Sequence, residues 1–311
     1  MLRYALRRLV LAIPIFLGIT LITFVLMYLV PGDATVIFID PQIGMMDPAA
    51  AAAIRKKWGL DDPLHVQYVR FVWNVVRGDL GISYRTNQDV TRAVLERIPA
   101  TATLAFAAMA IATVMGVSAG VFSAARRGSL FDTASMVVAL FGISMPVFWL
   151  GLMLMWFIGV KWPVLPPSGY GQGQLAYLVL PSLTLGLALT GGIARMTRSA
   201  MLDVIHRDYV RTARAKGADE RAVIGHHALR NALIPVVTLL GIETGTVMAG
   251  AVITETVFSW PGIGRLLVDS INQRDLPLVL GCVVLFAVIF IAVNLVVDVV
   301  YGLLDPRIRY A

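Results

Sequence analysis

The chain has 311 residues, of which 58% are hydrophobic and only 14% are charged, and its formal net charge is +7. Soluble domains carry about 25% charged residues, so this composition excludes a soluble globular protein and predicts an all-α, polytopic membrane protein. In a membrane chain a basic excess commonly sets the orientation, so it does not indicate nucleic-acid binding. The single cysteine, Cys282, excludes a disulfide framework.

The first apolar segment covers residues 9–30 and contains no charge, and it follows the basic residues Arg3, Arg7 and Arg8. A bilayer core of about 30 Å needs about 20 such residues. The run is too long for a secretory signal peptide, and no small-residue cleavage site follows it. We therefore expect residues 1–30 to form a cytoplasmic N-terminus and a first transmembrane helix.

Residues 31–97 are expected to fold into a small external (periplasmic) helical lobe. Two short helices would begin at capped prolines and end at glycines, namely Asp47-Pro48 to Gly59 and Asp62-Pro63 to Gly78. An apolar stripe runs along the second helix through Leu64, Tyr68, Phe71 and Val75. The lobe is either a lid over the helix ends or a docking surface, and the pattern leaves both open.

Residues 98–311 form the expected transmembrane domain. Five further apolar segments follow at residues 98–125, 133–160, 174–194, 231–258 and 276–301, which makes six spans and places both termini on one side. The predicted cytoplasmic segments hold fifteen basic residues and the two short external loops hold three. Since basic residues concentrate on the cytoplasmic side, both termini are expected in the cytoplasm.

The loop at residues 195–230, between the fourth and fifth spans, holds eight basic residues. As a helix it places Leu202, Ile205, Tyr209 and Ala213 on one stripe. Gly217 would break that helix, and Asp219 would cap a second short helix that reaches Leu229. Two helices joined by a glycine elbow suit contact with another protein. The alternative is a basic loop that only touches anionic lipid headgroups.

Ionisable residues inside a span are costly and are candidates for function. Glu243 lies near the middle of the fifth span, and it shares a polar strip with Thr246, Gly250 and Thr254. This strip is expected to line a translocation path. The alternative is a single buried carboxyl that is protonated or hydrogen-bonded to another helix. Glu255 lies closer to the end of the span, where we expect it to reach interfacial water.

The sequence predicts no catalytic residue, no cofactor and no metal ligand in this chain. It contains no Gly-Lys dipeptide and therefore no Walker A loop for ATP. Its four histidines form no H-E-x-x-H or similar ligand set.

Several motifs resemble the inner-membrane permease family of bacterial ABC importers, in its dipeptide and oligopeptide branch. The family's cytoplasmic signature is Glu-Ala-Ala, three residues and Gly, and only Ala213, Gly217 and Leu229 match it outright. The flanking DYVRTARAKG and HALRNALIPVVT are typical of the branch. So are Pro31-Gly32-Asp33, GLDDPLHVQY, ETVFSWPGIGRLL and LDPRIRY, which extend the resemblance nearly end to end.

The resemblance implies a multi-pass subunit of the bacterial inner membrane that works in binding-protein-dependent transport. It would pair with a homologous second permease, with two ATPase subunits that bind ATP and Mg²⁺, and with an external substrate-binding protein. The central loop would be the coupling helix that contacts the ATPase, through Arg211, Thr212, Ala213, Arg214, Ala215, Lys216, Gly217, Ala218, His227 and Leu229. Gly217 would allow the elbow, through backbone geometry or through close approach of a neighbour.

The resemblance favours di- or oligopeptides as the substrate, with glutathione or a nickel chelate as alternatives in the same branch. Two other classes compete with it. A secondary transporter would work without an ATPase and often shows inverted repeats, and an intramembrane enzyme would need a catalytic constellation at membrane depth.

Overall fold

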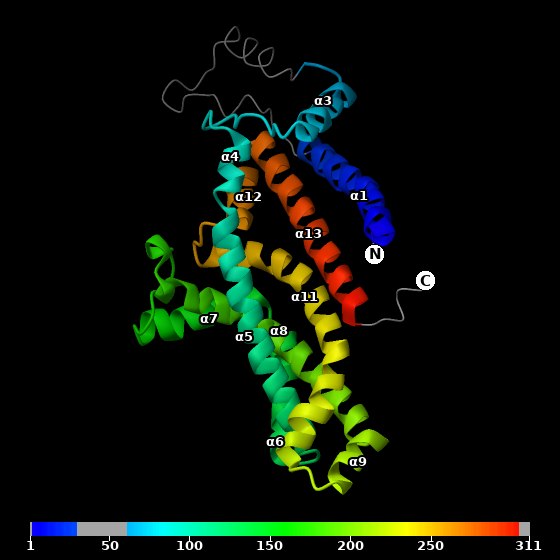
Figure 1. Cartoon of the computed structure of the whole chain (residues 1–311). Helices are drawn as coiled ribbons and strands as arrows, with labels where there is room; N and C mark the ends of the chain where they lie inside the picture. Colours follow the sequence, from blue (N-terminus) through cyan, green and yellow to red (C-terminus); the bar gives the residue numbers. More distant parts are fainter. Residues whose placement is uncertain (1, 30–60, 305–311) are drawn as a thin grey trace. The chain divides into compact units, whose positions relative to one another are not determined.

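The computed structural model describes residues 2–29 and 61–304, and almost all of this part of the chain is helical. A single bridge, between Ile82 and Asp89, is the only β pairing among the described residues. The described residues divide into two compact units: residues 100–261 with 292–304, and residues 2–29 and 61–99 with 262–291. Figure 1 shows the helices of both units. The fold class is therefore α-helical, as the composition predicts.

The first unit contains long apolar helices and the short helices of the central loop. Its elements are α5 (Ile98–Ala125, whose first two residues belong to the other unit), α6 (Leu130–Ser144), α7 (Val147–Leu154), the π-helix η2 (Met155–Lys161), the 3₁₀ turn η3 (Gly171–Gly173), α8 (Leu175–Ile205), α9 (Asp208–Ala215), α10 (Glu220–Ala222), the π-helix η4 (Val223–Ala228), α11 (Leu229–Val257) and the end of α13 (Leu276–Leu304). Helix α8 is central, because it packs against α6, α7 and α11.

Small residues allow α5 and α8 to approach closely. A Cβ at Gly116 would lie 2.7 Å from Ile193, and a Cβ at Gly120 would lie 2.5 Å from Thr197. Both distances are shorter than any van der Waals contact, so only glycine fits at these two positions. The four-residue spacing of the glycines thus brings the two backbones together, in the manner of small-residue packing in membranes.

Four helices among the described residues are long and apolar enough to cross a membrane, and a bent pair of helices makes a fifth if the pair is counted as one span. The bent pair is the predicted segment 133–160, which the structure divides into α6 and α7–η2 with an angle of 105° between them. The bend follows from Pro146, since Met145 before it is extended (φ −77°, ψ 130°), as residues before proline usually are.

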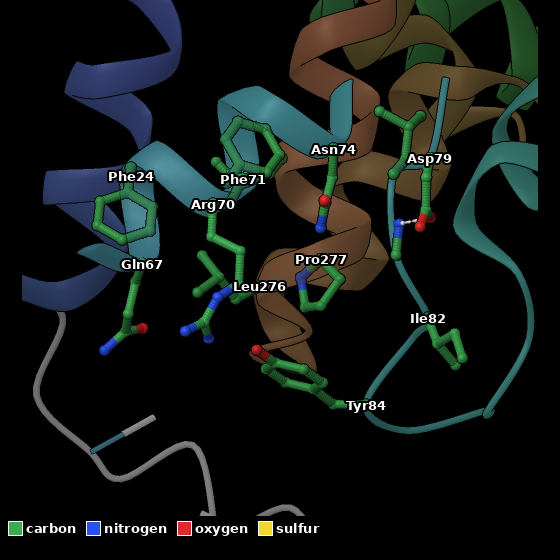
Figure 2. A pocket seen from close by; sticks show the side chains of 13 residues that line it. Phe24, Gln67, Arg70, Phe71, Asn74, Asp79, Ile82, Tyr84, Leu276 and Pro277 are labelled. Atoms are coloured by element: carbon green, nitrogen blue, oxygen red, sulfur yellow. Dashed lines mark hydrogen bonds between the residues drawn. The ribbon is translucent and has the colours of Figure 1, made fainter. Parts of the chain in front are cut away.

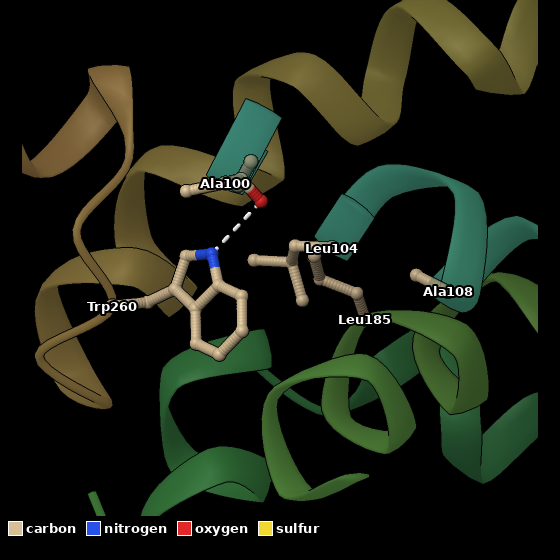
Figure 3. Packing of buried hydrophobic residues seen from close by; sticks show 6 residues of the cluster. Ala100, Leu104, Ala108, Leu185 and Trp260 are labelled. Carbon is tan, nitrogen blue, oxygen red and sulfur yellow. Dashed lines mark hydrogen bonds between the residues drawn. The ribbon is translucent and has the colours of Figure 1, made fainter. Parts of the chain in front are cut away.

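A buried cluster holds together the helix ends of the first unit. It contains Ala100, Leu104, Ala108, Leu185, Ala251 and Trp260 (Figure 3). The Trp260 indole is 2% exposed, and its Nε1–H donates to the carbonyl of Ala100 at 2.9 Å (Figure 3). A buried Trp needs such a partner, so this bond fixes the turn after α11 against the start of α5.

The second unit comprises α1 (Leu2–Leu29), α3 (Leu64–Val76), α4 (Val90–Leu95), α12 (Ile263–Asn272) and the start of α13. An apolar cluster of Val90, Val94, Ile263, Leu278 and Cys282 joins α4, α12 and α13. Asp275, which is fully buried, accepts hydrogen bonds from the hydroxyl of Ser83 and from the amides of Tyr84, Arg85 and Leu278. The Asp275 carboxylate thereby ties the 83–85 loop to the first turn of α13.

The outer-lobe predictions are confirmed in part. Gly78 ends α3 with φ +80°, but the helix begins one residue later than expected, because Pro63 is the N-cap itself. Asp62 does not cap the helix. Its carboxylate instead pairs with Arg70 at 2.6 Å. The predicted helix between Asp47 and Gly59 lies outside the described residues.

The predicted apolar stripe of α3 is half-buried at Tyr68, Phe71 and Val75 but exposed at Leu64. The Tyr68 ring lies edge-on to Phe24 of α1, with ring centroids 5.5 Å apart. Its hydroxyl donates to the carbonyl of Leu17 at 2.9 Å. The stripe therefore serves to hold α3 against α1.

Candidate functional site

The central basic loop begins with a helix break that the sequence pattern does not predict. Helix α8 ends at Ile205 and α9 starts at Asp208, with Arg207 in an extended conformation between them (φ −71°, ψ 151°). The prediction of one continuous stripe from Leu202 to Ala213 is therefore wrong. Tyr209 is 43% exposed, whereas Val210 and Ala213 form the buried side of α9.

Gly217 makes the predicted elbow, and its backbone explains why. Its φ is +80°, and no atom lies within 4 Å of a Cβ built there. Its N–H donates to the carbonyl of Arg214 at 2.9 Å, and the N–H of Ala218 donates to Ala213 at 3.2 Å. These two bonds form a Schellman motif, which needs a left-handed residue at this position. Backbone geometry, rather than close approach, thus requires the glycine.

The second helix of the loop begins as predicted but does not end at Leu229. The Asp219 side chain accepts from the amide of Arg221 at 3.2 Å, which caps α10. The chain then passes through the π-helix η4 directly into α11. The expected short helix is therefore the first part of a long one, because Gly225 has no positive φ and does not terminate it.

Polar contacts and one apolar cluster hold this loop in a single geometry. Arg214 donates to Glu220 at 2.8 and 3.1 Å, and this pairing raises the pKa of the Arg214 guanidinium. Tyr209 accepts from the side-chain amide of Asn231 at 3.0 Å. Val210 packs with Ala213 and Val223 beneath the elbow. The loop is thus joined to the start of α11.

The predicted coupling residues divide into a surface and its support. Six are exposed, and four are buried or half-buried. The exposed six are Arg211, Thr212, Arg214, Ala215, Lys216 and Gly217. The supporting four are Ala213, Ala218, His227 and Leu229. With three basic side chains among its six residues, the exposed set, which we call the elbow surface, suits a partner that offers carboxylates.

The residues predicted for a translocation path are all on α11, and the structure describes two of their side chains. Glu243 is half-buried, and a Cβ at Gly192 of α8 would lie 3.9 Å from its Oε1. Thr254 is 1% exposed, and its hydroxyl has no hydrogen-bond partner within the described part of the chain. The side chain of Thr246 lies outside the described set, and Gly250 has no side chain.

Glu255 does not reach interfacial water, so that expectation is wrong. Its side chain is fully buried and accepts a hydrogen bond from Thr101 of α5 at 2.6 Å. The turn that follows α11 explains the burial, since Trp260 folds back and donates its backbone N–H to the Glu255 carbonyl at 2.8 Å.

Sequence reasoning missed a buried ion pair close to the central loop. Arg198 of α8 donates to both oxygens of Asp132 at 2.6 and 2.8 Å. Asp132 also accepts from Ser123 and from the amide of Gly128. Arg198 was counted as a loop residue, although α8 continues to Ile205. The Ser129-x-x-Asp132 capping pattern at the start of α6 could have indicated a structural carboxylate.

Comparison with known families gives two matches that together cover nearly the whole chain. Residues 116–310 match the family described as binding-protein-dependent transport system inner membrane component. Residues 1–105 match the N-terminal family of the same transport system membrane component.

Two curated relatives and one solved structure are also similar. The chain is 42% identical to the dipeptide transport system permease protein DppB of Escherichia coli (strain K12), over 100% of this chain and 99% of the relative. It is 42% identical to the glutathione transport system permease protein GsiC of Salmonella paratyphi A, over 100% of both. An inward-facing structure of the MetNI methionine ABC transporter superposes with a TM-score of 0.57 at 20% identity, covering 68% of this chain and 96% of that chain.

Proposed function

The chain belongs to the family of inner membrane components of binding-protein-dependent transport systems, and we propose that it is the permease subunit of an ATP-driven importer of di- or oligopeptides. The observation that carries this proposal is the 42% identity, over the full length of the chain, to a dipeptide transport permease. The glutathione permease is equally similar by identity, so glutathione and a nickel chelate remain alternative cargoes for the same machinery.

In this proposal the chain crosses the inner membrane six times, with both termini in the cytoplasm. The helix that completes the six spans is α1, the first in the sequence. Its 28 residues extend about 42 Å at 1.5 Å per residue. Residues 31–97 form the external lobe, and residues 98–311 form the permease domain. The distribution of charge supports this orientation, because the loop at residues 195–230 is the most basic part of the chain and basic loops stay in the cytoplasm.

The elbow surface is proposed as the contact with the ATPase. A coupling element must be exposed to reach its partner and rigid to transmit displacement. Both requirements are supported by the exposed Arg211 and Lys216 and by the Schellman elbow at Gly217. The chain would then carry no catalytic residue, and ATP and Mg²⁺ would be bound by two partner ATPases.

The complex would also contain a homologous second permease and an external substrate-binding protein. Within this chain the path is proposed to run along Glu243, Thr246, Gly250 and Thr254 of α11. The buried hydroxyl of Thr254, which has no partner among the residues that the structure describes, supports this role, because such a group is satisfied when water or substrate reaches it.

The first test is co-purification followed by site-directed cross-linking. The single cysteine is buried, so a Cys282→Ala background allows one new cysteine at Thr212. We expect a second six-span permease and Walker-A-containing subunits to co-purify, and Thr212→Cys to cross-link to an ATPase subunit. A cysteine at Arg92, in the proposed external lobe, is the control. Purification of the chain alone with ATP-independent uptake would instead indicate a secondary transporter.

A further inference from the structure

The second unit contains a pocket that the proposed transport role does not use. Its volume is about 210 Å³, and it lies between α3, the 79–84 loop and the first turn of α13 (Figure 2). Sites for drug-sized ligands measure about 300–1,000 Å³, so this pocket suits a smaller molecule.

Four polar side chains line the pocket on its α3 side. One of them, Gln67, already donates to the carbonyl of Asp62 at 2.7 Å, and the other three are Arg70, Asn74 and Asp79. Arg70 and Asn74 lie one helical turn apart and extend from the same side of α3 toward the start of α13, and Asp79 lies on the loop that follows (Figure 2). One nitrogen of Arg70 bonds to Asp62, which leaves its other nitrogens available within the described structure. One carboxylate oxygen of Asp79 accepts a hydrogen bond from the backbone N–H of Gly81 at 2.8 Å. The second oxygen is available for a ligand within the described structure.

The amide side chain of Asn74 has no hydrogen-bond partner among the described residues, although it lines the pocket. An amide offers both a donor and an acceptor. It therefore matches a peptide group, which presents one acceptor and one donor in return. The pocket thus places a cation, an amide and a carboxylate in sequence.

The other walls of the pocket are mainly apolar, with the phenol of Tyr84 as their polar side chain (Figure 2). Phe71 stands on α3, and Leu276, Pro277 and Leu280 come from α13. Phe24 of α1 completes this wall and is 3% exposed. These groups offer an apolar surface to the side chains of a ligand whose charges are held elsewhere.

We infer that this pocket binds a short zwitterionic peptide, with its carboxylate on Arg70, its peptide group on Asn74 and its ammonium on Asp79. Arg70 and Asn74 are about 6 Å apart along the helix axis, so the two side chains can reach the carboxylate and the neighbouring peptide group of one short peptide. A simple anion would leave Asp79 unused, and a simple cation would leave Arg70 unused. The site lies outside the proposed path and needs no ATPase.

The test measures binding to the purified full chain in phosphatidylcholine nanodiscs, without ATPase or binding protein. Equilibrium dialysis compares alanyl-alanine, its C-terminal amide and its N-acetyl derivative. Because each blocking group removes one charge-assisted contact, we expect either one to weaken binding about tenfold or more. Arg92→Gln, in an exposed pair with Glu96, is the control variant and should bind as the wild type does.

Each pocket variant should lose one kind of discrimination only. Arg70→Gln should bind the free acid and the amide equally while still rejecting the acetylated peptide, and Asp79→Asn should do the converse. Equal loss for all three ligands in either variant would mean a structural role and overturn the inference. Absence of saturable binding would also overturn the inference. Displacement of the peptide by glycerophosphoethanolamine at a lower concentration than by alanyl-alanine would overturn it too, because that result would identify a lipid-headgroup site.

Because binding is measured without the transport partners, this test and the proposed transport role can fail independently. A chain that co-purifies with ATPases but binds no peptide refutes the pocket alone. A chain that binds peptide with the predicted charge selectivity but has no ATPase partner refutes the transport role alone.

Discussion

Removal of Asp132 should destabilise the first unit more than any change at a surface charge. The carboxylate is 6% exposed and its partner Arg198 is 26% exposed. Asp132→Ala would leave the Arg198 guanidinium, the Ser123 hydroxyl and the Gly128 amide without their acceptor. Breaking a buried ion pair on one side costs about 3–5 kcal/mol. Since water reaches part of Arg198, we expect a loss of about 3 kcal/mol in the free energy of unfolding.

The decisive measurement is a double-mutant cycle with Arg198→Met. Each single variant leaves one unpaired charge, whereas the double variant leaves none. Its cost should therefore be smaller than the sum of the two single costs, by about 2 kcal/mol. The free energy of unfolding can be measured by steric trapping in bicelles. Costs that add to within about 0.5 kcal/mol would refute the assignment of the pair as an energetic unit, whatever the distances between the atoms.

Three further predictions concern backbone conformation and packing. Gly217→Ala should lower the free energy of unfolding by about 1 kcal/mol, because its φ is left-handed, and it should reduce ATP-coupled uptake in assembled complexes. Gly225→Ala has equal free space but no positive φ, so it should lower neither stability nor uptake. Equal uptake in the two variants would contradict the elbow. Gly120→Val should lower the free energy of unfolding by about 1–3 kcal/mol through overpacking. Gly18→Val is the control and should leave thermal unfolding unchanged, because no atom lies within 4 Å of a Cβ at Gly18. Similar shifts of the melting temperature in the two variants would disprove the close helix contact. Trp260→Phe should lower the free energy of unfolding by about 1 kcal/mol, because the hydrogen bond from its indole N–H to the Ala100 carbonyl is lost. An unchanged denaturation midpoint would refute that contribution.

Sequence patterns predicted the long helices well, because apolar runs decide them locally. The charge-free segment 98–125 coincides with α5, and the glycine elbow at Gly217 was located correctly. The start of the outer helix was displaced by one residue, since a proline can serve as N-cap as well as N1 and only the backbone angles distinguish the two.

The failures have two kinds of cause, which are contacts between residues distant in sequence and local turns of the chain. Asp132 and Arg198 are 66 residues apart, and no local pattern pairs them. Glu255 was expected to reach water because the sequence places it near the end of its span. The sequence does not show that the following turn folds back over it. The continuous stripe from Leu202 to Ala213 failed because charged and apolar residues keep a helical period across His206, where the chain turns.

The break at His206 also marks the end of an uninterrupted rod. Helix α8 has 31 residues, so it is about 46 Å long, whereas the hydrocarbon core measures about 30 Å. About a third of the helix would then stand beyond the lipid, directly before the elbow surface. A tilt of about 10° about its outer end would displace its tip by about 8 Å over that length. A lever of this kind would turn a small rotation within the membrane into a large displacement at the end that carries the elbow surface.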